Sequence, residues 1–232
     1  MRLPRLLLVL AALSACAPVA APPNAPAAPR PGASAANVTR FEAEVRRYEA
    51  QDRATPPAPG GVVFVGSSSF RLWPDLAADF PGAPVLNRGF GGATLPEVLH
   101  YTPRVVLPHR PRLVLLYAGD NDLADGRTPA QVVADYQAFV ALLRGALPGV
   151  RVAFVAIKPS PSRWGLVGQA RAANAGVRAV IARDSLQEYV DVFTPMLGAD
   201  GRPRPELFGP DSLHMTPAGY ALWRERIAPV LR

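Results

Sequence analysis

The chain has very little cysteine and lysine, and its charged residues form no long run. Cys16 is the only cysteine among 232 residues, so no internal disulfide can form. Lys158 is the only lysine, and the arginines are scattered, with no run longer than Arg46-Arg47. The net charge of +7 therefore lacks the clustering with aromatic residues that is typical of nucleic-acid binders, and we predict no nucleic-acid partner. Three scattered histidines and one cysteine predict neither a metal site nor a cofactor.

The N-terminal residues are typical of a targeting segment. A short positive region precedes apolar residues 6–13, which are too few to span a bilayer. Leu13-Ser14-Ala15-Cys16 resembles the lipobox of bacterial lipoproteins, which implies cleavage before Cys16 and acylation of its thiol. We therefore expect a lipid anchor on Cys16 in the bacterial cell envelope, as a periplasmic lipoprotein, with Ala17 favouring the outer membrane. Ordinary signal-peptide cleavage with an incidental cysteine is the alternative.

The remainder suits one domain on a short tether. Apolar residues make up 49% of the chain and charged residues 19%, which excludes disorder throughout. Residues 17–36 are mostly Ala and Pro, a composition typical of an extended spacer. A helix is expected at 39–53, where Thr39 and Glu42 match a capping box and the apolar residues share one face. The predicted organisation is a signal peptide at 1–15, the lipidated Cys16 and tether at 16–36, and a single domain at 37–232.

Beyond Gly60, short apolar segments alternate with helical patterns. Strands are expected at 62–65, 85–87, 113–117, 152–157 and 189–192, and helices near 94–106, 129–145, 168–183 and 217–231. Continuous apolar strands are typical of a parallel sheet that is covered on both faces. The alternation predicts an α/β fold, a three-layer α/β/α sandwich with a five-stranded, mostly parallel sheet. Ligands of such sheets bind beyond the carboxyl ends of the strands.

Four sequence blocks lie at that edge or near it. They are Gly66-Ser67-Ser68-Ser69-Phe70, Asn87 to Thr94, Gly119-Asp120-Asn121-Asp122 and Asp211-Ser212-Leu213-His214. Each block has a structural reading: a helix cap of serines, a glycine turn, an Asn/Asp turn, and a capping aspartate beside an exposed histidine. Each also has a chemical reading: an exposed hydroxyl, close backbone approach to a ligand, an amide donor, and a carboxylate that orients an imidazole.

Together and in this order, the blocks resemble those of the SGNH (GDSL-type) hydrolase superfamily over about residues 61–231. Ser67 replaces the aspartate of the Gly-Asp-Ser block, and residues 64–73 resemble the platelet-activating-factor acetylhydrolase-like branch. The resemblance implies a flavodoxin-like fold and a serine esterase in which Ser68 is the nucleophile, His214 the base and Asp211 its orienting acid. It implies an oxyanion hole from the backbone N–H groups of Ser68 and Gly92 and the Asn121 amide. Asp122 is left with a structural or a proton-transfer role.

The substrate is less strongly indicated than the chemistry. Residues near the expected strand ends or the blocks are candidates for a substrate pocket, with core burial as the alternative for the apolar ones: Trp73, Phe90, Lys158, Trp164 and Met215. We expect a small acyl ester, such as acetate on a cell-envelope glycan. A lysophospholipid or another lipid ester or thioester is the second reading, and an idle envelope-binding lipoprotein the third. An acyltransferase and any oligomeric state stay open.

Overall fold

The computed structural model describes residues 39–232, which belong to one compact unit. The expected signal peptide, Cys16 and the tether lie outside the described residues. Five strands build one sheet: β1 (Val62–Gly66), β2 (Val85–Gly89), β3 (Leu113–Tyr117), β4 (Arg151–Val155) and β5 (Gln187–Val190). Their order is β2-β1-β3-β4-β5 and all neighbours run parallel. The predicted five-stranded α/β fold is confirmed, and the sheet is parallel throughout.

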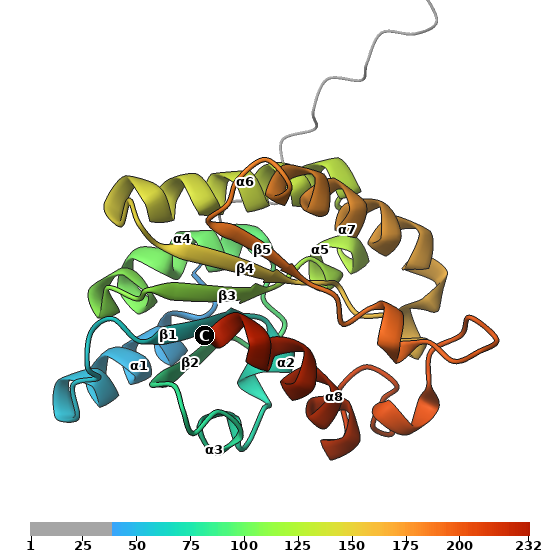
Figure 1. The fold of residues 1–232 in the computed structure, drawn as a ribbon, viewed down its shortest axis with the longest axis horizontal. Helices are drawn as coiled ribbons and strands as arrows, with labels where there is room; N and C mark the ends of the chain where they lie inside the picture. The colour runs from blue at the N-terminus through green and yellow to red at the C-terminus, as the bar shows by residue number, and fades with distance from the viewer. Residues whose placement is uncertain (1–38) are drawn as a thin grey trace, which may run out of the picture. The chain divides into compact units, whose positions relative to one another are not determined.

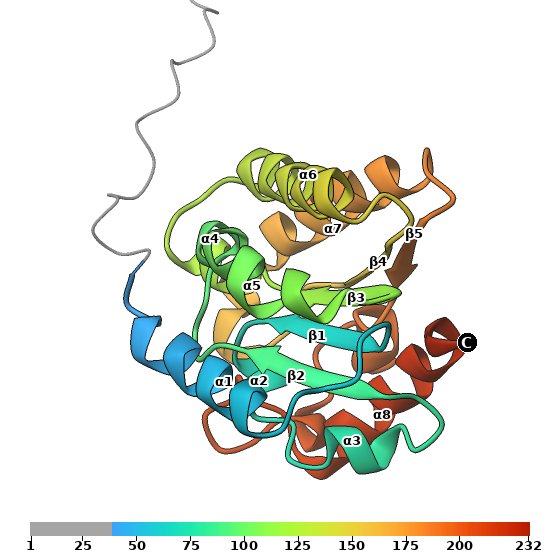
Figure 2. The ribbon, with the colours of Figure 1, turned by 90° about the vertical axis from the view of Figure 1, so that its left-hand side faces the viewer.

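Helices cover both faces of the sheet (Figures 1 and 2). One face packs against α1 (Glu42–Ala54), α4 (Leu95–Val105), α6 (Pro129–Ala146) and α7 (Val167–Ile181). The other packs against α2 (Ser68–Arg71), α3 (Leu76–Asp79) and α8 (Pro217–Ile227). The short α5 (Asp120–Ala124) follows β3. Within residues 39–232, no helix combines the length and apolar character that a membrane crossing requires.

The strands show why their apolar residues are continuous. In β1, Val63 and Val65 belong to the core beneath α4 and α6, whereas Val62 and Phe64 belong to the opposite core beneath α3 and α8. Successive side chains of a strand point to opposite faces, so a sheet with two covered faces needs apolar residues at both.

The helix termini were predicted with mixed success. The capping box at the start of α6 is confirmed, because the Thr128 hydroxyl accepts a hydrogen bond from the Gln131 N–H at 3.2 Å. The capping box expected for the first helix is wrong: α1 begins after Phe41 without a side-chain cap. The Glu42 carboxylate is instead bound by Arg46 and by Arg104 of α4, so a tertiary contact takes the place of the local cap.

The strand order reverses between β1 and β3, which is where ligands bind in open α/β sheets. β1 ends at Gly66, whose φ of +146° favours glycine. A β-carbon at this position would lie 1.9 Å from the Tyr117 carbonyl oxygen at the end of β3. The absence of a side chain therefore allows the chain to turn sharply from β1 into α2 at this edge of the sheet.

Candidate active site

Ser68 is the first residue of α2 and is partly exposed at the end of β1. Its Oγ lies 2.9 Å from Nε2 of His214. The neighbouring hydroxyls of Ser67 and Ser69 are buried and have no hydrogen-bond partner among the described residues. Of the three adjacent serines, only Ser68 is in contact with the imidazole, as the family resemblance implies.

Asp211 and His214 form a closed turn before α8. One Asp211 oxygen, Oδ1, accepts hydrogen bonds from the N–H groups of Leu213 and His214 at 3.0 and 2.9 Å. The other, Oδ2, lies 2.5 Å from Nδ1 of His214. Ser212 bridges the turn with a φ of +55°, and its carbonyl oxygen accepts a hydrogen bond from the Ser162 N–H at 3.0 Å. The carboxylate thus holds the imidazole so that Nε2 faces Ser68.

The contacts also set the charge of the acid. The backbone N–H groups of His214 and Leu213, together with the His214 imidazole, lower the pKa of Asp211 to about 2. An ionised carboxylate at Nδ1 favours the tautomer that carries its proton there. Nε2 is then free to accept the Ser68 proton, which is the arrangement that activates a serine hydroxyl as a nucleophile.

Asn121 lies in α5, directly after β3, and is nearly buried. Its Nδ2 donates a hydrogen bond to the Ala93 carbonyl oxygen at 2.9 Å. This bond joins α5 to the end of the glycine block, which we define as residues 89–92 at the end of β2. Gly92, the residue before Ala93, has a φ of +77°. The Ser68 N–H is at the first position of α2, where helices leave N–H groups without an intrahelical partner. The structure therefore gathers the three expected donors at neighbouring strand ends.

Asp122, also in α5, has a structural role. Its two oxygens accept the N–H of Leu95 at 3.0 and 3.1 Å and so bind the first turn of α4. The side chain is fully buried, and burial raises its pKa to about 7 despite that bond and the nearby Arg127. Because Asp122 contacts neither Ser68 nor His214, the geometry favours the structural role over proton transfer.

Helix α1 and the turn before it support the glycine block from outside the sheet. The Tyr48 hydroxyl donates to the Gly89 carbonyl oxygen at 2.6 Å, and Arg40 donates to the Gly92 carbonyl oxygen at 2.8 Å. Arg40 also pairs with Glu97, which caps α4 through Thr94. Sequence reasoning missed this support, because nothing in the α1 pattern indicates which strand end it contacts.

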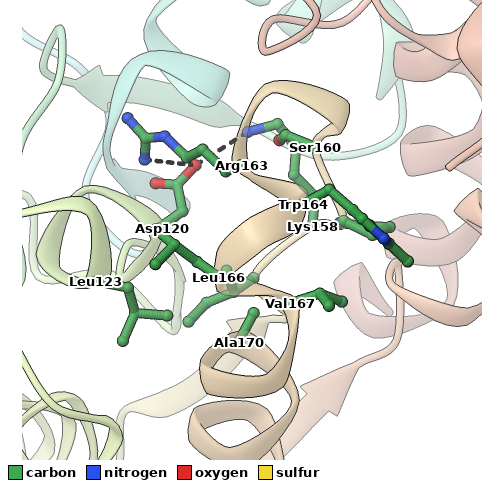
Figure 3. A pocket seen from close by; sticks show the side chains of 11 residues that line it. Asp120, Leu123, Lys158, Ser160, Arg163, Trp164, Leu166, Val167 and Ala170 are labelled. Atoms are coloured by element: carbon green, nitrogen blue, oxygen red, sulfur yellow. Dashed lines mark hydrogen bonds and ion pairs between the residues drawn. The ribbon is translucent and has the colours of Figure 1, made fainter. Parts of the chain in front are cut away.

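The five candidate pocket residues divide into two groups. Trp73, Phe90 and Met215 are buried in the hydrophobic cores, because their apolar surfaces pack against aromatic neighbours or the sheet, and we correct their expected place. Lys158 and Trp164 line a pocket between α5 and α7, with an empty volume of about 300 Å³ that opens to solvent (Figure 3). Ser68 and His214 are not among its lining residues.

A buried polar network lies between this pocket and Asn121. The Asp120 Oδ2 atom accepts hydrogen bonds from the Tyr117 hydroxyl and the Lys158 ammonium at 3.0 and 3.1 Å. Arg163 donates to Asn121 Oδ1 at 2.8 Å. Its guanidinium also lies 3.6 Å from the Asp120 carboxylate (Figure 3). Sequence reasoning singled out Lys158 but gave no role to Arg163 or Asp120. The one available signal was the only lysine of the chain, placed directly after a buried strand.

Comparisons with known proteins agree with this geometry. Residues 58–222 match the GDSL-like Lipase/Acylhydrolase family. The chain belongs to this family. Its members are serine hydrolases that act on esters, and the fold, the order of the blocks and the Ser68–His214 contact all fit that assignment. No curated protein is similar enough in sequence to count as a relative.

Several solved structures share the fold of this chain. A Streptococcus pneumoniae protein, provisionally described as a platelet activating factor, has a TM-score of 0.75 at 17% identity, covering 84% of this chain and 94% of its own. A GDSL-like lipase from Bacteroides thetaiotaomicron has a TM-score of 0.70 at 22% identity, covering 82% and 97%. The catalytic domain of peptidoglycan O-acetyltransferase A from Streptococcus pneumoniae has a TM-score of 0.57 at 18% identity, covering 75% and 93%.

Proposed function

We propose that this GDSL-like acylhydrolase cleaves small acyl esters through an acyl-enzyme on Ser68. The Ser68 oxygen attacks the ester carbonyl carbon while Nε2 of His214 takes its proton, and Asp211 stabilises the resulting imidazolium. When the tetrahedral intermediate collapses, the bond to the leaving alkoxide breaks and His214 protonates that oxygen. Water then attacks the acyl-enzyme by the same route, giving a carboxylic acid and free Ser68.

The negative oxygen of the tetrahedral intermediate needs preorganised donors. The N–H groups of Ser68 and Gly92 and the Asn121 amide are the proposed donors, since they come from three loops that meet at one edge of the sheet. One such donor contributes roughly 100- to 1000-fold to the rate.

The observation that carries this proposal is the unbroken contact from Ser68 Oγ through His214 to Asp211, at 2.9 and 2.5 Å. Ser68→Ala should abolish both fluorophosphonate labelling and ester hydrolysis while circular dichroism stays unchanged, because it removes the nucleophile without disturbing a core residue. Ser67→Ala is the matched control and should keep both activities. Loss of labelling in Ser67→Ala with retention in Ser68→Ala would contradict the assignment, and an unlabelled wild type would favour the idle binding role.

A short acyl group, such as acetate on a cell-envelope glycan, is the proposed substrate. Among residues 39–232, Leu72 is the one large hydrophobic side chain counted as exposed, so the described surface offers little for a lipid chain. The shared fold with a peptidoglycan O-acetyltransferase domain supports the glycan reading. The Ser68 and His214 side chains are also partly open to solvent, as a polymeric substrate would require.

A series of p-nitrophenyl esters from acetate to palmitate tests the chain length. We expect kcat/KM to fall steeply beyond four carbons, because the surface of residues 39–232 exposes little apolar area to compensate for a longer chain. A maximum at eight carbons or more would favour a lysophospholipid or lipid-ester substrate instead. Acetyl transfer to an added glycan, compared with release of free acetate, distinguishes a transferase from a hydrolase.

We also propose that the enzyme works in the bacterial envelope, anchored through Cys16. The lipobox-like Leu13-Ser14-Ala15-Cys16 supports this location, and the Ala/Pro-rich residues 17–36 would act as the spacer. A lipoprotein of the periplasmic face meets acetylated glycans, so the location and the proposed substrate agree.

A further inference from the structure

The side-chain amide of Asn121 is held in one orientation by two partners. Its Nδ2 donates to the Ala93 carbonyl oxygen at 2.9 Å, and its Oδ1 accepts from Nη2 of Arg163 at 2.8 Å. If the amide were reversed, its NH₂ group would face the guanidinium donor and its oxygen would face a carbonyl oxygen. Both hydrogen bonds would then be lost. Arg163 therefore selects the orientation in which Nδ2, with one hydrogen still unused, faces the glycine block.

Arg163 also contacts Asp120. It lies in a short 3₁₀ segment, Pro161–Leu166, and its own φ of −115° departs from helical geometry. Its Nη1 lies 3.6 Å from Asp120 Oδ2, the atom that also accepts hydrogen bonds from Lys158 and Tyr117. Two cations from the segment after β4 thus converge on one carboxylate next to Asn121 (Figure 3).

The charges of this network do not cancel. Burial by itself raises the pKa of the Asp120 carboxyl, but the charges of Lys158 and Arg163 hold it below its ordinary value, so Asp120 is ionised. Two positive groups and one negative group leave about one positive charge. The Lys158 side chain is only 1% exposed and that of Arg163 22% exposed, so water screens this charge weakly. The residual positive charge favours negative charge that develops on the far side of the Asn121 amide.

We propose that Arg163 is a positioning residue of the ester hydrolysis, which acts by orienting and polarising the Asn121 amide, with Asp120 and Lys158 as its anchor. A guanidinium on Oδ1 draws electron density from the amide and makes the Nδ2 hydrogens stronger donors. Substrate contacts Asn121 and not Arg163. The inference rests on the proposed role of Asn121 in the oxyanion hole.

A double-mutant cycle tests whether Arg163 acts through Asn121. Arg163→Met keeps the length of the side chain and removes its donors. On p-nitrophenyl acetate we expect this variant to lower kcat by about 10- to 100-fold and to leave KM within about threefold of the wild type. Asn121→Ala should lower kcat by roughly 100- to 1000-fold. Adding Arg163→Met to Asn121→Ala should then cost less than about threefold more, because the residue it positions is already absent.

The controls separate this role from a merely structural one. Arg144→Met is the matched variant, since Arg144 has a similar exposure and pairs with Asp184 away from the site, and it should leave kcat unchanged. If Arg163→Met does not fold by circular dichroism, Arg163→Gln takes its place in the same cycle. Equal factors with and without Asn121, or an unchanged kcat in the single variant, would overturn the positioning role. A wild type that neither labels at Ser68 nor hydrolyses esters would overturn the proposed function as well.

Discussion

Asp211 is a half-exposed carboxylate whose neighbours still control its ionisation. Its side chain is 51% exposed, yet the N–H groups of His214 and Leu213 keep its pKa at about 2. Because the folded pKa is depressed, the acid stays ionised until the pH falls towards 2. Across the pH range in which the enzyme works, Asp211 therefore keeps a fixed negative charge against Nδ1 of His214.

Asp211→Asn should lower kcat by about 10³- to 10⁴-fold, because an amide neither stabilises the imidazolium nor favours the required tautomer. In the wild type, Asp211 should cause no loss of activity above pH 4, because its pKa is about 2. Values of kcat/KM measured from pH 4 to 9 for the wild type and Asp211→Asn check this. An acid-side loss above pH 4 that is present in the wild type and absent from Asp211→Asn would contradict the depressed pKa of Asp211.

Asp122 has the opposite shift and so the opposite dependence of stability on pH. Burial raises its pKa to about 7 in the folded chain, against about 4 in an unfolded one. The folded state therefore binds the proton more tightly. The stability linked to this group is fully present below about pH 4 and is lost as the pH rises through about 7.

Asp122→Asn should remove that dependence while its amide oxygen still accepts the Leu95 N–H. At about 1.4 kcal/mol per pKa unit, the wild-type free energy of unfolding should fall by up to about 4 kcal/mol between pH 4 and pH 8, relative to the variant. Urea unfolding at both pH values measures it. Parallel curves for the two proteins would show that Asp122 is not titrating in this range.

At the scale of elements, α1 and the turn before it contact the edge of the sheet where the site lies. Tyr48 of α1 binds the Gly89 carbonyl oxygen and Arg40, in the turn before α1, binds that of Gly92, so this segment supports both ends of the glycine block. Gly89 itself leaves room for α2, since a β-carbon there would lie 2.4 Å from the Arg71 nitrogen. The block is therefore held between a helix on either side.

Tyr48→Phe should lower the free energy of unfolding by about 1–2 kcal/mol, because it leaves a buried carbonyl oxygen without its donor. Tyr189→Phe is the control, since the Tyr189 hydroxyl makes no hydrogen bond to the part of the chain that the structure describes. Thermal or urea unfolding compares the two variants. Equal effects would show that the Gly89 contact contributes nothing of its own.

At the scale of the molecule, the contacts of the site lie within one unit of the chain. Ser68, Asn121 and Arg163 follow β1, β3 and β4, and His214 precedes α8. The reversal of strand order between β1 and β3 brings the first two strand ends to one place. All of these contacts join residues within the range 40–214, so anchoring and chemistry should be separable.

A chain that begins at residue 37 should fold and hydrolyse p-nitrophenyl acetate with the kcat of the full-length protein. Cys16→Ser in the full-length protein should move it from the membrane fraction to the soluble extract and leave kcat unchanged, because the acyl chains on Cys16 provide the proposed anchor. Hydrolysis of p-nitrophenyl acetate checks the kcat of both proteins. Membrane fractionation, with a mass measurement that shows whether acyl chains are attached, checks the location of Cys16→Ser. A Cys16→Ser protein that stays in the membrane fraction would show that the anchor lies elsewhere.

Features encoded within a few residues could be predicted from the sequence. The continuous apolar strands indicated a sheet covered on both faces, and the Thr128 capping box marked the start of α6. The Asp211–His214 turn is also local, because it is closed by backbone groups three residues apart. The short α3 and α5 were missed, since four or five residues carry no helical period, whereas the start of α2 at the serine block was expected.

Contacts between distant residues follow from no local pattern. The Ser68–His214 bond joins positions 146 apart. Residue spacing could not distinguish Ser68 from Ser67 and Ser69; the family resemblance indicated Ser68, and the tertiary structure places its hydroxyl against His214. The Arg163–Asn121 bond joins positions 42 apart. The physical reason is that propensity and periodicity act over a few residues, whereas the direction of a side chain at a strand end depends on every element packed around it.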